Sequence, residues 1–394
     1  MIRGMSTPAD KPTIHPLLRD GYRPFFFGAM LFATVTMAAW LIDFLQGPAM
    51  PSIFGSGHWH GHEMLFGFTL AFFAGFLLHA CRNWTGIMPL GSNALLALAL
   101  LWLSGRLIHF FPDLIPAQLA AIPDLLFPLL LTAVIAASLS SHRVTHAYAL
   151  VEVSAIISIT AIFGYWGVTG WQSGLAASNA QLTLYASIAL LAVLAGKLIP
   201  GFTEKTLGYE LPVGRYDGAI ENTAIAALYL MMALLFVFPQ GGALPALVAM
   251  VAAVANGLRL KRWYFREIWQ HPMLWVLHCG YGWVVVGLLL VGVGMAGAMP
   301  PASGWHALGI GGIAVPAAGM MARVLLSRHE ENRLPDSWIV LAFILLNVAA
   351  ISMTIAPLSG QDLYRTLVLV SGLSWIGAFG VMSWRFTPTL LSST

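Results

Sequence analysis

A succession of twelve apolar runs constrains this chain more than any other feature of its sequence. Hydrophobic residues make up 58% of the 394 residues and charged residues only 9%, which is unlike a soluble domain. Each run approaches the roughly 20 residues that an α-helix needs to cross a bilayer. The sequence therefore predicts an all-α, polytopic membrane protein with about 12 transmembrane helices. The runs begin at about Phe25, His60, Ser92, Pro123, His146, Gln181, Ala219, Gly242, His271, Gly304, Ser337 and Asp362.

The loops between the runs are mostly short, and their charges predict an orientation. We expect one membrane domain over residues 25–386, a cytoplasmic N-terminal segment over residues 1–24 and a cytoplasmic tail over residues 387–394. Lysine and arginine favour the cytoplasmic side of short loops. With the N-terminus placed inside, all 19 of them except Arg106 and Arg365 fall on or near the inner side. Both termini are therefore expected in the cytoplasm, with membrane lipid as the surroundings. The net charge of +3 reflects this bias, and no nucleic-acid partner is expected.

The N-terminal residues bear on how the chain enters the membrane, and the cysteines bear on disulfides and iron–sulfur clusters. The first 22 residues lack the apolar core of a cleavable signal peptide, so the first apolar run is expected to direct insertion. Cys81 and Cys279 both fall toward the cytoplasmic side, where disulfides are disfavoured, and are expected to be free thiols. Two cysteines also exclude a four-thiolate iron–sulfur cluster on this chain.

The start of the second run carries an unusual group of polar residues. His58, His60, His62 and Glu63 lie within six positions at the edge of a predicted span. Histidine is the commonest metal ligand, and polar residues at membrane depth are costly and usually functional. His58 and His62 are four residues apart, so they share one face of a helix. The segment therefore predicts a metal or haem site.

Other histidines divide by depth into two groups. His109 and His306 fall at the outer ends of the third and tenth runs, where they add to His58, His60 and His62. Seen from the inner side, His278 lies roughly 10 Å deep in the ninth run. We expect His60, His62, His278 and His306 to bind a cofactor, and these four with His58 to hold a metal. An outer copper site is favoured over an inner one, whose candidates are His79, Cys81, His278 and Cys279.

Two further patterns concern the interior of the bundle. Glu152, Lys197 and Glu221 lie within predicted spans, where such groups pair with another charge, carry protons or contact a cofactor. The ninth and tenth runs are rich in glycine, which lets helix backbones approach closely. Plain helix packing is favoured over a slot for a flat cofactor.

Several distinctive blocks occur from the first to the tenth span. They are Arg23-Pro24-Phe25-Phe26, Trp59 to Gly67, Gly75 to Leu78, Asn83 to Gly86, Gly196 to Thr203, Trp275 to Tyr281, His306-Ala307-Leu308, Met320, Met321 and Arg323. Together these blocks resemble one family, the NnrS family of bacterial haem- and copper-containing membrane proteins linked to nitric-oxide stress. The resemblance has two departures. His79 stands where the family usually has threonine, and residues 327–333 lack its usual Gly-His-Thr-Gly-Arg run.

The resemblance implies a haem, a copper ion, nitric oxide or a related small molecule as the ligand, and the bacterial inner membrane as the location. The sequence lacks the adjacent His-His pair of haem–copper oxidases, so neither a terminal oxidase nor a standard nitric-oxide reductase is expected. Whether the chain is an enzyme stays open, as do the haem type and the redox partner. Two alternatives remain: a transporter of a metal or metal complex, and a haem sensor without turnover.

Overall fold

The computed structural model describes residues 14–47, 59–108, 110–111, 113–144, 148–168, 173–208, 218–327 and 334–392, and every regular element in these ranges is helical. The longer helices are α1 (Tyr22–Gln46), α3 (Leu70–Thr85), α4 (Ser92–Ile108), α5 (Ala117–Ser141), α6 (Tyr148–Val168), α7 (Ser173–Leu207), α8 (Gly218–Val237), α9 (Ala243–Trp263), α10 (Pro272–Met295), α12 (Val315–Leu326), α13 (Ser337–Ile355) and α14 (Gln361–Leu391). The shorter ones are η1 (Pro16–Leu18), α2 (Trp59–His62), η2 (Glu63–Thr69), η4 (Arg266–Gln270), α11 (Ala302–His306), η5 (Ala307–Ala314) and η6 (Ala356–Leu358).

These helices confirm the predicted fold class. Ten helical segments among the described residues are long and apolar enough to cross a membrane, and we treat the two shorter apolar helices, α4 and α6, as the remaining two of the twelve predicted crossings. Two crossings are composite, because α2, η2 and α3 form one continuous helix and α11, η5 and α12 form another. The helices begin at Tyr22 and end at Leu391, a few residues beyond the predicted membrane domain.

Local sequence signals mark several helix ends. Asp336 caps α13, since its carboxylate accepts from the backbone N–H groups of Trp338 and Ile339 at 3.1 Å each. α3 ends at Gly86, which has a φ of 73° and donates its N–H to the Arg82 carbonyl at 2.8 Å. Such left-handed residues commonly end helices and favour glycine because it has no Cβ.

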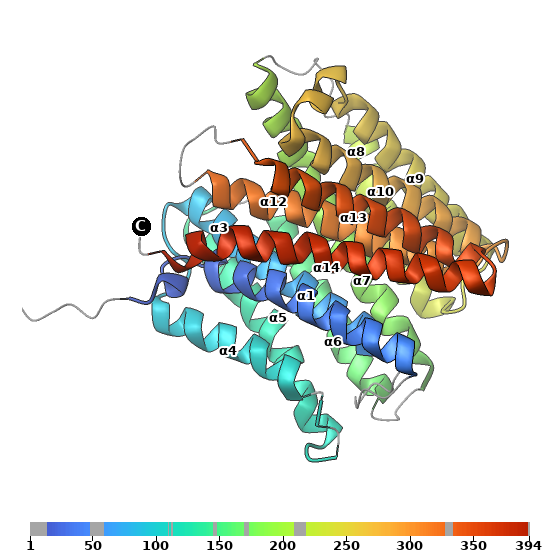
Figure 1. Ribbon diagram of the computed structural model, residues 1–394, viewed down its shortest axis with the longest axis horizontal. Coiled ribbons are helices and arrows are strands. Elements are labelled where there is room, and N and C mark those ends of the chain that lie inside the picture. Colours follow the sequence, from blue (N-terminus) through green and yellow to red (C-terminus); the bar gives the residue numbers. More distant parts are fainter. Residues whose placement is uncertain are drawn as a thin grey trace, which may run out of the picture.

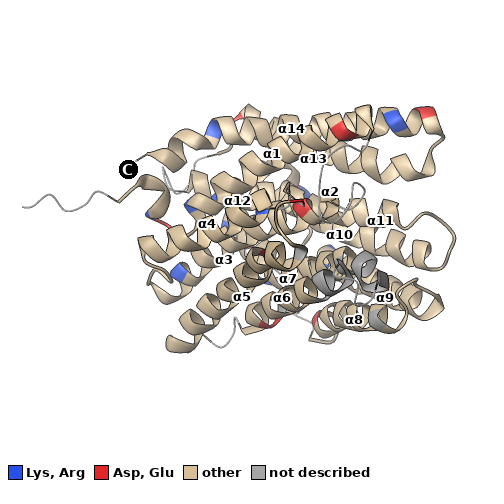
Figure 2. Ribbon diagram, turned by 90° about the horizontal axis from the view of Figure 1, so that it is seen from below, with Lys and Arg blue, Asp and Glu red and all other residues tan. Residues whose placement is uncertain are grey.

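The start of α1 and the end of α14 lie at one face of the bundle, which we call the terminal face. Arg23 at the start of α1 donates to the carbonyls of Leu390 at 3.0 Å and Ser392 at 2.8 Å, beside the end of α14. Helices α1 and α14 run side by side across the bundle (Figure 1). The opposite side is the far face, where α1 and α13 end and α2, α7, α11 and α14 begin. Charged residues are sparse along the helices (Figure 2).

The glycine-rich segments serve close helix packing, as the sequence favoured. A Cβ at Gly311 in η5 would overlap the Trp283 ring of α10, and one at Gly287 in α10 would overlap Leu308 of η5. A Cβ at Gly67 in η2 would likewise overlap the Phe32 ring of α1. The composite helices therefore approach their neighbours closely because these positions carry no side chain.

Glu221 is one of the three charges that the sequence places within spans. Glu221 of α8 forms an ion pair with Arg259 of α9 at 2.7 Å. Arg259 is buried, and it also donates to the Ala192 carbonyl of α7 at 3.1 Å and to the Tyr281 hydroxyl of α10. This arginine therefore ties four helices together, and a Cβ at Gly196 would overlap its guanidinium. The glycine of the Gly196-Lys197 block is thus explained by packing.

The orientation of the bundle stays a prediction, and it follows from the charge bias. Reporter fusions at residue 1 and residue 394 should both be active only in the cytoplasmic sense, because the terminal face carries most of the lysine and arginine. The fusions are compared in intact cells with a periplasmic and a cytoplasmic reporter. A periplasmic signal at either end contradicts the orientation.

Candidate functional site

A large cavity lies toward the far face, and two of the predicted histidines line it. Its volume is about 460 Å³, and its walls come from α1, α2, η2, α7, α11, η5, α13 and α14. His60 and His306 line it together with aromatic rings and three methionines. The remaining walls are largely apolar. The lining includes Met37, Trp40, Met64, Phe68, Thr69, Gln181, Leu184, Trp305, Ile310, Ile313, Met353 and Trp375.

One ring nitrogen of His306 is hydrogen-bonded to the backbone, as in most metal-binding histidines. Its Nδ1 lies 2.8 Å from the carbonyl oxygen of Ala302, one helical turn earlier. In the neutral ring, an N–H at Nδ1 donates to this carbonyl and leaves the lone pair at Nε2 as the donor to a ligand. A second hydrogen bond of this kind sets the tautomer and ring orientation of most ligating histidines.

His60 offers a second nitrogen to the same cavity. Its ring stacks on Trp40 of α1, with centroids 4.5 Å apart and planes 28° apart. Its Nδ1 is buried and has no hydrogen-bond partner among the described residues. The rings of His60 and His306 also lie close enough to interact electrostatically. A buried polar atom without a partner is costly, so a ligand that satisfies His60 would stabilise the site.

The two histidines sit in matching local structures. Each follows a buried or half-buried tryptophan: Trp59 Nε1 lies 3.4 Å from Asp43 Oδ2, and Trp305 Nε1 donates to the Tyr185 hydroxyl at 3.1 Å. After each Trp-His pair the helix widens into a π-helix, η2 over seven residues and η5 over eight. Such π-helical segments are rare and frequent at functional sites.

The widened turns of η2 keep their backbone groups paired. The Gly67 carbonyl accepts from Trp102 Nε1 of α4 at 3.0 Å, and the Met64 carbonyl accepts from the Thr69 hydroxyl at 2.8 Å. These bonds matter because an unpaired backbone group is expensive within a membrane. Trp102 therefore helps η2 to keep its π-helical shape beside the cavity.

His62 lies in a separate, buried cluster of charges. His60 and His62 are two residues apart on one helix, so their side chains leave on different faces. His62 Nε2 is 3.0 Å from Asp124 Oδ2, and its Nδ1 is 3.3 Å from Glu63 Oε1. Both ring nitrogens therefore face carboxylates, and His62 does not line the cavity.

Arg106 completes this ion cluster of His62, Glu63, Arg106 and Asp124. Its Nη1 donates to Glu63 Oε2 at 2.7 Å and its Nη2 to Asp124 Oδ1. All four side chains are at most 6% exposed. Two carboxylates and one guanidinium leave one negative charge, which a proton on His62 would neutralise. Arg106, one of the two exceptions to the charge bias, is thus a buried ion-pair partner.

The inner histidines and cysteines lie apart from the cavity. His278 is buried, with Nδ1 2.9 Å from the Leu274 carbonyl and Nε2 3.2 Å from the Trp263 carbonyl at the end of α9. His79 Nε2 lies 3.1 Å from the Asn83 amide. Among the described residues, Cys81 and Cys279 are free, and no three His, Cys, Asp or Glu side chains form a group able to hold a metal ion. His58 and His109 lie outside the described residues.

Several residues of the site were missed by sequence reasoning. Asp124 is an acidic residue inside an apolar run, and that position alone was a usable signal for a buried pair. Trp40, Gln181 and Met353 carried no such signal, since aromatic, amide and thioether side chains are common at membrane helix ends and in packed interiors. Their part in the cavity depends on how distant helices pack.

Replacing Arg106 by leucine should destabilise the protein strongly. The change leaves Glu63 and Asp124 buried without their cation, which is expected to lower the free energy of unfolding by about 3–5 kcal/mol. The matched control is Arg365→Leu, because Arg365 is the exposed arginine predicted for the same side, and its loss should change stability by less than about 0.5 kcal/mol. Unfolding of both variants in detergent is the measurement, and equal losses contradict the cluster's role.

Comparison with known proteins agrees with this architecture. The family model described as NnrS protein matches residues 16–393, nearly the whole chain. No curated protein matches the sequence. The match covers all twelve crossings, including both composite helices with their Trp-His pairs. The chain therefore belongs to the NnrS family.

Proposed function

We propose that this chain is a haem- and copper-binding membrane protein that handles nitric oxide or metal–nitrosyl species and so protects against nitric-oxide stress. One observation carries the haem part: His60 and His306 face one largely apolar cavity, and His60 Nδ1 is buried there without a partner. Membership of the NnrS family supports the link to nitric oxide.

The cavity suits an aromatic prosthetic group in size and chemistry. Its volume of about 460 Å³ falls within the range of small-molecule sites, roughly 300–1,000 Å³. Its walls include the rings of Trp40, Phe68, Trp305 and Trp375, while Gln181 supplies a polar side chain. Such a lining leaves imidazole nitrogens as the main donors, which are the ligands that haem iron most often takes.

The residues have separable tasks in this proposal. His306 would hold the iron through Nε2, because the Ala302 carbonyl occupies Nδ1. His60 would present its nitrogen to the group bound in the same cavity, and its stacking on Trp40 fixes the plane of its ring. Bound haem would supply an iron centre for a small neutral ligand such as nitric oxide. The ring nitrogens of His62 and His278 already face carboxylates or carbonyls. These two histidines would therefore stabilise the packing of the surrounding helices rather than bind the metal.

Copper is proposed at the far face, next to the sequence positions of the outer histidines. His109 follows α4, and His58 directly precedes α2, which carries His60. Imidazole ligands suit copper. The inner alternative would use the thiols of Cys81 and Cys279, which are free cysteines.

Haem content tests the histidine pair directly. His306→Ala should lower bound haem by at least about tenfold, since even loss of an outer-shell partner commonly costs that much affinity. His60→Ala should also lower it and shift the Soret band. The matched control is His142→Ala, because His142 makes the same bond to a carbonyl one turn earlier, Ser138 at 2.9 Å, but is exposed. Wild-type haem content in both cavity variants contradicts the proposal.

Copper content separates the outer site from the inner one. A variant with His58→Ala and His109→Ala should lose copper and keep haem. A variant with Cys81→Ala and Cys279→Ala should keep both. Copper per haem, measured by elemental analysis of the purified protein, is the readout. Loss of copper in the cysteine variant alone would move the site to the inner side.

A further inference from the structure

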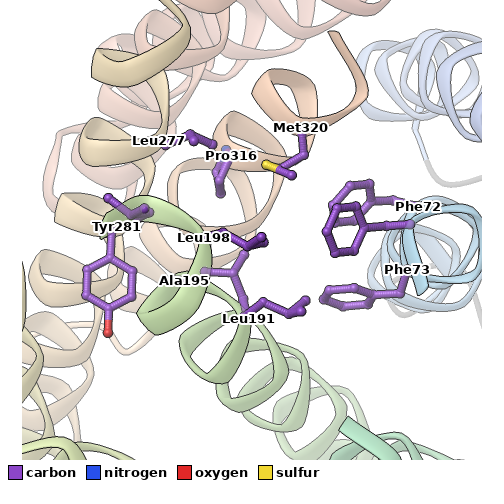
Figure 3. Close-up of a pocket in the computed structure, with 12 residues that line it drawn as sticks. Phe72, Phe73, Leu191, Ala195, Leu198, Leu277, Tyr281, Pro316 and Met320 are labelled. Atoms are coloured by element: carbon purple, nitrogen blue, oxygen red, sulfur yellow. The ribbon is translucent and has the colours of Figure 1, made fainter. Parts of the chain in front are cut away.

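A second, small cavity lies within the bundle and is almost entirely apolar. Its volume is about 40 Å³, and it is enclosed by α3, α7, α10 and α12 (Figure 3). Phe72 and Phe73 face Leu191, Ala195 and Met320 across it. These five side chains are at most 7% exposed. The proposed haem site uses none of them.

The chemistry of this cavity excludes water and admits a small apolar molecule. A buried water needs two to four polar partners, which apolar walls do not provide. Tyr281 contributes the one hydroxyl of the lining, and Figure 3 shows it directed away from the cavity. That hydroxyl donates to Asn256 Oδ1 at 2.5 Å. Empty apolar cavities of proteins stay dry and take up apolar guests such as xenon.

The same three crossings line both cavities, and along each of them the small cavity comes after the histidine cavity. On η2 and α3, Phe68 and Thr69 line the histidine cavity, while Phe72 and Phe73 line the small one, one helical turn or roughly 6 Å further on. On α7, Leu184 lines the former and Leu191 the latter, roughly 10 Å apart along the axis. The third crossing repeats this order, with Ile313 followed by Pro316.

We propose that the small cavity is a docking site for an uncharged, apolar diatomic gas that exchanges with the histidine cavity. The volume exceeds the 10–15 Å³ that one water-sized probe needs, and no lining group can hydrogen-bond such a guest. Nitric oxide has the required size and polarity, and it partitions into hydrocarbon. The proposal rests on the proposed function for the identity of the gas, but the existence of the site does not.

Xenon binding tests the site without haem. In the haem-free protein, ¹²⁹Xe NMR should show a saturable site that Ala195→Val abolishes, because two added methyl groups occupy the cavity. The matched control is Ala97→Val, since Ala97 is an exposed alanine on α4, and it should keep the site. Phe73→Leu enlarges the cavity and should increase xenon affinity, which keeps the test decisive if Ala195→Val fails to fold. Equal xenon binding in all four proteins overturns the proposal.

Ligand rebinding tests the exchange with the histidine cavity. In the haem-loaded protein, flash photolysis of bound carbon monoxide should show rapid internal rebinding whose fraction changes with xenon pressure. Ala195→Val should remove this xenon dependence, while Ala97→Val should retain it. A xenon site without any effect on rebinding would make the cavity a packing void only and overturn the docking role. A protein that binds xenon but no haem would refute the proposed function alone.

Discussion

The pairing of Arg106 with Glu63 and Asp124 is the interaction on which the site depends. Hydrocarbon offers no hydrogen bonds to a charge, so a buried guanidinium and two buried carboxylates are stable only together. Glu63 is the first residue of η2 and follows the His-Gly-His segment directly. Pairing of His62 with Asp124 of α5 beside this ion pair fixes the rotation of α2, and His60, two residues earlier, therefore leaves on a different face, at the cavity.

The same physical rule applies to the two composite helices, which line one shared cavity. The second crossing starts with Trp59-His60, the tenth carries Trp305-His306 at the end of α11, and both continue as a π-helix. The wider turn changes the register of the side chains that follow, and it is tolerated only because neighbouring helices satisfy the backbone. Trp102 does so for η2, and α10 packs against the glycines of η5. The widened segments thus border the histidine cavity, and the straight segments beyond them border the small apolar one.

Much of the fold could be predicted from the sequence because the surrounding hydrocarbon imposes it. Apolar runs of membrane length must be helical, since a helix satisfies all its backbone groups internally. The twelve predicted runs accordingly match twelve helical crossings. The sequence also drew attention to the right segment for the site. It did not separate His60 from His62, although their spacing of two residues places them on different helix faces, because nothing in one sequence tells which face meets the ion cluster and which meets the cavity.

The sequence by itself determined that this is a helical membrane protein, where its crossings lie, and which family it resembles, because these depend on local hydropathy and on contiguous motifs. Only the tertiary structure decided which histidines meet. In the fold, His60 and His306 line one cavity although they are 246 positions apart in the sequence. His62 lies in the ion cluster with Asp124 and Arg106, and His278 faces the carbonyls of α9 and of its own helix. The reason is physical: burial of charge and exclusion of water are properties of packed helices, and a chain acquires them only when distant crossings come together.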